Sequence, residues 1–180
     1  MDKRRTVSHN KIIKALSQFA EEGHPFIEVT VADFAKKAAV SRPTIYRNYL
    51  TLKDPLLVQL QFKMNDFTNS LERQPIDSST FIRLTLTYWQ QNIKLLNLLI
   101  WADSIDELNH TFSSWIGKLL ANRHLSKRDQ KYIANFYAAT VVSFIRTFIA
   151  NHDFSDSAVT ETVTLFNQLT NNCGQLFFHS

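Results

Sequence analysis

The sequence has few of the residues that build turns and cross-links. Its 180 residues include three glycines, four prolines and one cysteine. So few turn formers, and no alternating run of β-branched residues, argue against an all-β chain. The single cysteine, Cys173, excludes a disulfide framework and a CxxC metal site, and it suits a reducing compartment. With 44% hydrophobic residues, the composition predicts an all-α protein with a sizeable core.

Long apolar runs are also missing. The longest, Leu95–Ala102 and Ala138–Ala150, are broken by Asn97 and Arg146 and fall short of the length of a membrane span. The charged start at residues 1–5 is not followed by the apolar core of a signal peptide. We therefore expect a cytoplasmic protein with no membrane partner.

Catalytic and metal-binding constellations are absent from the sequence. The six histidines never fall at helical spacing to one another or to a cluster of carboxylates. Asp103, Asp106 and Glu107 do cluster, but at a predicted helix start, where acidic side chains complement the helix dipole. Neither a Gly-rich phosphate loop nor a nucleophile elbow is present. We expect neither an enzyme nor a bound metal or cofactor.

The basic charge, by contrast, is concentrated in one segment. Residues 1–50 hold nine Lys or Arg and five Asp or Glu, whereas residues 51–180 hold eleven of each. The whole net charge of +4 therefore belongs to the first segment. A basic excess on one module is typical of binding to phosphates of nucleic acid, although alone it also fits a solvated surface.

Two short helical patterns fill the stretch Thr30–Tyr49, with a tight break at residues 39–41. Thr30 can cap the first, because its side-chain oxygen can accept a hydrogen bond from an N–H of the first turn. Apolar residues recur there at the spacing of one helical face, namely Val31, Phe34, Ala35 and Ala38.

The second pattern combines a cap, a first-turn proline and an exposed polar face. Ser41 is the predicted cap, Pro43 costs little in the first turn, and Ile45 faces inward. The residues left outside suit a helix in a DNA major groove, where they can meet phosphates and base edges: Arg42, Pro43, Thr44, Tyr46, Arg47 and Asn48.

This stretch resembles the helix-turn-helix of the TetR family of bacterial transcriptional regulators. The family pattern, T-x-x-x-I-A-x-x-A-G-V-S-x-x-T-x-Y-x-x-F, corresponds here to Thr30, Phe34, Ala35, Ala38, Ala39, Val40, Ser41, Thr44, Tyr46 and Tyr49. The similarity covers about the first 57 residues, and the remainder only by general layout. Ala39 departs from the family, which usually has Gly at this turn position, where φ is often positive. Leu52 also departs, since the family usually has a phosphate-contacting Lys there, but Lys53 is adjacent.

The resemblance implies a DNA-binding domain at residues 1–50 and a helical ligand-binding and dimerisation domain at 51–180. It implies a homodimer that binds a double-stranded operator, usually as a repressor, with an affinity set by a ligand. The DNA-binding set carried over, with Lys53 added as the neighbour of Leu52, is Thr30, Arg42, Pro43, Thr44, Tyr46, Arg47, Asn48, Tyr49 and Lys53.

Aromatic residues mark the second part of the chain. All three Trp and eleven of the fourteen Phe follow residue 50. The resemblance implies a ligand cavity among the middle helices, and apolar ligand pockets are lined by such residues, although the same rings also fill cores. The candidates for a small apolar or neutral ligand are Phe62, Tyr88, Trp89, Trp101, Trp115, Phe136 and Tyr137.

The remaining periodicity predicts further helices. A basic arm at residues 3–5 precedes a first helix at 8–22, which ends at a left-handed Gly23. A capping box at Thr51 and Asp54 opens a helix to 73, and a break follows at 74–78. Further helices are predicted at 79–99, from about 105 to 122, at 127–150 after a Ser126 cap, and at 156–172 after a Ser155 cap, before a tail at 175–180. We expect the last two to form a dimer contact, with Phe166 near its axis.

Two other readings of the sequence stay open. One is a TetR-like adaptor that binds a protein partner in place of a metabolite, as regulators of dihydroxyacetone kinase operons are thought to do. The other is a helical ligand-binding protein that no longer binds DNA. Intact Arg42, Thr44, Tyr46 and Arg47 argue against the second.

Overall fold

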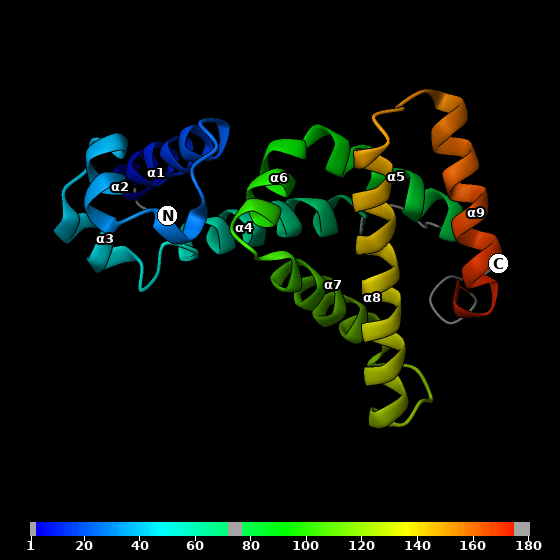
Figure 1. Ribbon diagram of the computed structural model, residues 1–180. Coiled ribbons are helices and arrows are strands. Elements are labelled where there is room, and N and C mark those ends of the chain that lie inside the picture. Colours follow the sequence, from blue (N-terminus) through cyan, green and yellow to red (C-terminus); the bar gives the residue numbers. More distant parts are fainter. Residues whose placement is uncertain (1–2, 72–76, 175–180) are drawn as a thin grey trace. The chain divides into compact units, whose positions relative to one another are not determined.

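The computed structural model describes residues 3–71 and 77–174, which form helices joined by short connections (Figure 1). No strand occurs within these two ranges, which confirms the all-α fold class. The elements in chain order are α1 (Lys3–Glu21), the short 3-10 helix η1 (Phe26–Glu28), α2 (Val31–Ala38), α3 (Arg42–Asn48), α4 (Asp54–Leu71), α5 (Ser78–Gln91), α6 (Ile93–Trp101), α7 (Ile105–Leu120), α8 (Lys127–Ala150) and α9 (Asp156–Gly174).

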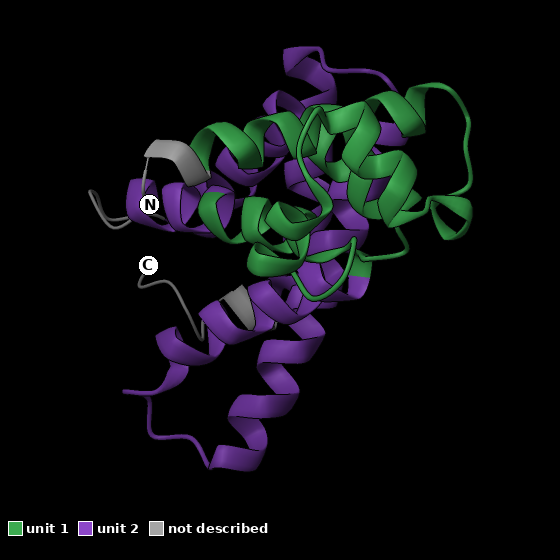
Figure 2. Cartoon of the chain, turned by 90° about the vertical axis from the view of Figure 1, so that its left-hand side faces the viewer, with its two compact units in different colours: residues 1–62, 94–105 green, residues 63–93, 106–180 purple. Residues whose placement is uncertain are grey.

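The chain divides into two compact units, coloured separately in Figure 2. Unit 1 comprises residues 1–62 and 94–105, and unit 2 comprises residues 63–93 and 106–180. Unit 1 therefore holds the helix-turn-helix, the start of α4 and nearly all of α6. The division by function at residue 50 is a different one and stays a prediction.

Unit 1 has a small core of apolar side chains from its short helices. Helix α1 packs against α2, and α2 packs against α3. Each of these short helices contributes a few apolar side chains to a shared core, and the burial of those side chains holds the helices together. The fully or nearly fully buried ones include Ile12, Leu16, Phe34, Ala38 and Ile45.

Unit 2 is built around aromatic rings. Helix α5 packs against both α8 and α9, which also pack against each other. The Phe81 ring, completely buried on α5, stacks on Trp115 at 5.5 Å between centroids and lies 6.4 Å from Phe67 and 6.3 Å from Tyr137. Phe166 of α9 is equally buried and meets Tyr137 edge-on at 5.6 Å. Offset and edge-to-face contacts of this kind add to the stabilisation from burial alone.

The predicted caps are confirmed. The side-chain oxygens of Thr30, Ser41, Ser126 and Ser155 each accept a hydrogen bond from the N–H three residues on. Such bonds satisfy donors that the first helical turn cannot pair internally. After α1, Gly23 has φ of 74°, the predicted left-handed cap.

Two expected helix bounds need correction, and others fall outside the residues that the structure describes. The helix expected at 79–99 is two helices, because Asn92 leaves the helical region (φ −111°, ψ 25°) and its side-chain Nδ2 donates to the Tyr88 carbonyl. Such local bonds compete with the helical ladder. The first helix begins at Lys3, five residues before the predicted start at Ser8, so the expected arm at 3–5 has a helical backbone. The expected helix end at 73, most of the break at 74–78 and the tail at 175–180 lie outside the described residues.

Among the described residues one helix, α8, is long and apolar enough to cross a membrane by length and composition alone. Core helices pass the same test, and α8 contributes eight buried side chains to the helix packing described above.

Candidate nucleic-acid interface

The turn between α2 and α3 has the backbone that the motif requires. Ala39 has φ of 50° and ψ of 48°, in the left-handed region, as expected for the position usually filled by Gly. Its N–H donates to the carbonyls of Ala35 and Lys36, and the Val40 N–H donates to Ala35 at 3.1 Å. A left-handed residue that closes a helix in this way turns the chain sharply, so only three residues separate α2 from α3.

Helix α3 is almost entirely presented to solvent. Ile45 is its only buried side chain, whereas Tyr46 is 62% exposed and Arg42, Pro43 and Arg47 are also exposed. The helix is seven residues long and is stabilised at its start by Ser41. Its surface therefore carries two guanidinium groups and a phenol, all suited to donate to phosphate oxygens or base edges.

Three other predicted DNA-binding residues make hydrogen bonds within the motif. Thr30 caps α2 and donates its hydroxyl to the Asp33 carboxylate. Thr44 is half-buried, with its hydroxyl 2.8 Å from the Ser41 hydroxyl. Asn48 donates from Nδ2 to the Thr44 carbonyl at 2.7 Å. These bonds hold the shape of the motif, whether or not the same side chains also meet DNA.

Tyr49, also predicted to bind DNA, is buried. Its hydroxyl lies 2.8 Å from His9 Nδ1, and His9 Nε2 lies 3.0 Å from Gln59 Oε1. A carbonyl oxygen only accepts, so Nε2 donates to Gln59, which leaves Nδ1 to accept from the tyrosine. This cluster joins α1, the end of α3 and α4, and it gives Tyr49 a positioning role.

Sequence reasoning missed His9 and Gln59 as partners of that cluster. A signal was available for His9, which lies on the same helical face as Ile12 and Leu16, at spacings of three and seven residues. A histidine on the buried face of a helix needs hydrogen-bonding partners. No comparable local signal marks Gln59, which lies fifty residues further along the chain.

Lys53 is placed by a contact far away in the sequence. Its Nζ donates to the backbone carbonyl of Asp103 at 2.8 Å, just after α6. No carboxylate lies within ion-pair distance of Lys53 among the described residues, and its positive charge is therefore not neutralised there.

The turn before α4 is held by the predicted capping box. Thr51 N–H donates to Asp54 Oδ2 at 3.1 Å, and Asp54 N–H donates back to Thr51 Oγ1 at 3.3 Å. Burial alone would raise the pKa of Asp54, but hydrogen bonds from the Thr51 hydroxyl and from the N–H groups of Leu50 and Thr51 outweigh it and lower the pKa. The charged carboxylate therefore fixes the loop that precedes Lys53.

The seven ligand candidates do not form one group. Phe62 and Trp101 belong to unit 1, and Phe136 is exposed on α8. The remaining four lie in the ring cluster of unit 2, around Phe67 and Phe81: Tyr88, Trp89, Trp115 and Tyr137.

Two of these four have notable polar groups. The Tyr88 hydroxyl donates to the Lys63 carbonyl at 2.7 Å, and burial together with the negative charge of Asp66 raises the pKa of Tyr88 to about 12. Trp89 is completely buried, and its Nε1 makes no hydrogen bond to another described residue. The oxygen of Asn109, also in unit 2, is buried and unpaired in the same sense. No group of three or more metal-ligating side chains gathers in the described part of the chain.

Comparison with solved structures places this fold. No protein-family model matches the chain, and no curated protein matches it in sequence. Lin0861 from Listeria innocua is similar in structure, with a TM-score of 0.82 and 22% identity, over 94% of this chain and 93% of that one. A TetR-like transcriptional regulator from Rhodococcus sp. RHA1 is similar with a TM-score of 0.55 and 16% identity, over 91% and 96% of the two chains. The chain thus has the all-helical fold of a TetR-like regulator.

Proposed function

We propose that this protein is a TetR-like transcriptional regulator that binds operator DNA through α3. The observation that carries the proposal is the surface of α3, which buries one side chain and exposes Arg42, Pro43, Tyr46 and Arg47. A short helix with this surface, set after a left-handed turn, fits a major groove, where backbone contacts position the helix and side chains read base edges.

Charge supports the same surface. The net charge of +4 in residues 1–50 equals that of the whole chain, and all of α3 lies in this segment. Lys53 is the proposed additional phosphate contact. Affinity should therefore fall steeply with salt, with a slope of log affinity against log salt of about −0.9 per neutralised phosphate. A flat salt dependence would exclude the basic segment as the contact surface.

The test is a gel shift with DNA fragments selected from the genome of the source organism. Tyr46→Phe and Arg47→Ala should each weaken binding by roughly tenfold, because each removes a hydrogen bond to a charged group. Lys118→Ala, which removes one exposed positive charge on α7, is the control and should bind DNA as the wild type does. Wild-type affinity in both α3 variants would refute the assignment of the recognition helix.

We further propose a homodimer formed by α8 and α9. Two recognition helices on one operator give an affinity that a single helix does not reach. Large apolar side chains are exposed on both helices: Tyr132, Phe136, Leu165 and Leu169. Phe166 does not belong to this surface, because it is 0% exposed and packs on Tyr137 and Phe144 within its own chain.

The residue for testing the dimer is therefore Leu169 and not Phe166. Leu169 is 66% exposed, so Leu169→Glu should leave the fold intact and place two like charges near a two-fold contact. We expect a monomer by light scattering, with weakened DNA binding, whereas Gln168→Glu one position earlier should remain a dimer. A Leu169→Glu dimer that still binds DNA would contradict the proposed interface.

The ligand that controls this regulator is proposed to bind in unit 2. A buried donor on Trp89 and a buried acceptor on Asn109, both unpaired among the described residues, support a neutral ligand that can hydrogen-bond. Leaving such groups unpaired costs about 1–3 kcal/mol each, which a bound molecule can recover. We propose that the protein represses transcription, and that the ligand relieves repression by favouring a second conformation that binds the operator less tightly. We also propose that the protein is soluble and cytoplasmic and that it is not an enzyme.

A further inference from the structure

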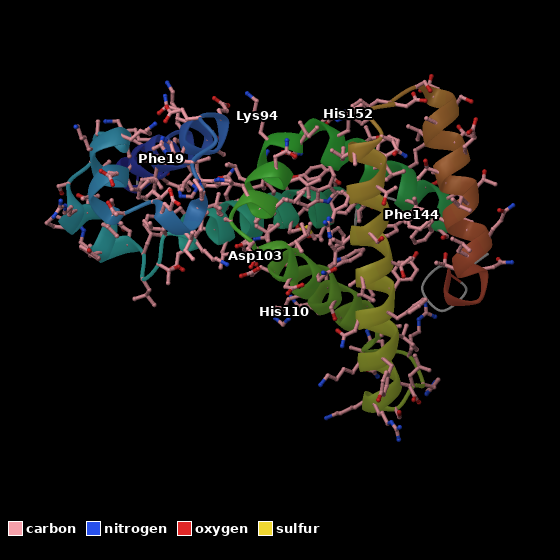
Figure 3. All side chains as sticks on the ribbon, viewed as in Figure 1. Phe19, Lys94, Asp103, His110, Phe144 and His152 are labelled. Carbon is pink, nitrogen blue, oxygen red and sulfur yellow. The ribbon has the colours of Figure 1, made fainter. Side chains whose placement is uncertain are left out.

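A hollow in unit 1 brings together residues from three separate segments. It measures about 580 Å³ and lies where η1, the turn before α4 and the end of α6 meet. Its walls include Phe26 and Ile27 of η1, Leu52 and Lys53 of the turn, and Trp101 of α6. Asp103, labelled in Figure 3, lies at its edge just after α6. The volume is in the range of small-molecule sites, which is about 300–1,000 Å³.

The apolar walls are held in place before any ligand arrives. The Phe26 and Trp101 rings meet edge to face, with centroids 5.0 Å apart and planes at 85°. Trp101 Nε1 donates to the His24 carbonyl at 2.7 Å, which fixes the orientation of the indole. At the margin, Ile27 is 93% exposed, so its side chain is available to contact a bound molecule.

One cation faces this hollow without an acidic partner. The Lys53 ammonium donates to the neutral carbonyl of Asp103 at 2.8 Å and has no ion pair among the described residues. An ammonium group has three donors, so two remain for another acceptor. A charge-assisted bond to an anion is stronger than a bond to a neutral group. Asp103 also lines the hollow, and its exposed carboxylate would repel any negative charge on a ligand beyond the one that Lys53 compensates.

We propose that this hollow binds small aromatic monoanions, with the ring against Phe26, Ile27 and Trp101 and the anionic group on Lys53. The site is separate from the aromatic cluster of unit 2, and its ligand differs in carrying a charge. One consequence rests on the proposed function. Because Lys53 is the proposed phosphate contact, a bound anion competes with DNA for the same ammonium group and weakens DNA binding.

The first experiment measures dye binding to the full chain. The probes are anilinonaphthalene sulfonate, an aromatic monoanion, and phenylnaphthylamine, the same ring system without the sulfonate. Lys53→Met should weaken binding of the sulfonate roughly tenfold and leave the neutral dye unchanged. Ile27→Ser should weaken both dyes. Leu50→Ser, at a residue that is also 93% exposed but lies outside the hollow, is the matched control and should weaken neither.

Sulfonate binding that is unchanged in both Lys53→Met and Ile27→Ser would overturn the site.

The second experiment repeats the gel shift with saturating sulfonate dye. Wild-type protein should lose roughly tenfold in DNA affinity, whereas Lys53→Met, already weakened, should be insensitive to the dye. Unchanged wild-type affinity would refute the competition. A protein that binds no DNA at all would refute the proposed function, and the dye results would then decide the site alone.

Discussion

Unit 1 and unit 2 both bury apolar side chains, but a buried polar cluster adds to the packing in unit 1 and a cluster of aromatic rings does so in unit 2. Unit 1 keeps α3 nearly uncovered and ties its end to α1 through the buried pair of His9 and Tyr49. In unit 2, α8 buries eight side chains, and one of them, Tyr137, belongs to the cluster of aromatic rings. Because α3 buries only one of its own side chains, hydrogen bonds and the Ser41 cap have to hold it in position. We therefore expect unit 1 to lose stability when its hydrogen-bonding side chains are replaced, and unit 2 to lose stability when its aromatic rings are truncated.

The largest expected effect is in the ring cluster of unit 2. Phe81→Ala removes a completely buried ring that contacts Phe67, Trp115 and Tyr137. We expect the free energy of unfolding to fall by about 3–5 kcal/mol, measured by chemical denaturation. Phe62→Ala in unit 1, where the ring is exposed, should cost well under half as much. Equal losses would show that burial of the Phe81 ring is not the source of its contribution.

The next effect tests the polar cluster of unit 1. His9→Leu keeps an apolar side chain of similar size but removes a partner of the Tyr49 hydroxyl and of Gln59. We expect a loss of about 2 kcal/mol in the free energy of unfolding, together with weaker DNA binding because the end of α3 is less well held. His24→Leu, at an exposed histidine, is the control and should change little. A His9→Leu protein as stable as the wild type would show that the hydrogen bonds of this cluster add nothing to the apolar packing of unit 1.

A smaller effect depends on pH at the start of α4. The pKa of Asp54 is lowered in the folded state, so its contribution to stability is present above its unfolded pKa and is lost as pH falls through the folded pKa. Asp54→Asn keeps a hydrogen-bond acceptor but removes the charge, so it should cost about 1 kcal/mol at neutral pH. The difference from wild type should shrink once the pH falls below 3.8, the ordinary pKa of an aspartate. Denaturation curves at neutral and acidic pH measure this. A difference that persists in acid would show that the charge is not responsible.

The smallest effect is a gain at the turn of the helix-turn-helix. Ala39 has φ of 50°, which costs a residue with a Cβ atom about 1 kcal/mol, whereas Gly also has more freedom to lose on folding. Ala39→Gly should therefore raise the free energy of unfolding by about 0.5 kcal/mol. Ala32→Gly, at a helical position in α2, should lower it by up to about 1 kcal/mol. Opposite signs in thermal melts would confirm the strain, and two losses would contradict it.

The sequence by itself determined the features that depend on neighbours within a few residues. Caps at Thr30, Ser41 and Ser126, the left-handed Ala39 and the inward Ile45 follow from bonds and periodicity inside one or two turns. Tertiary structure decided the rest, because its contacts join residues that no local rule relates. Lys53 meets a carbonyl fifty residues away, and Trp101 donates to His24 across seventy-seven residues and so lies in unit 1. The break at Asn92 was also missed, since apolar residues continue on both sides and the side-chain bond that interrupts the helix leaves no mark on periodicity.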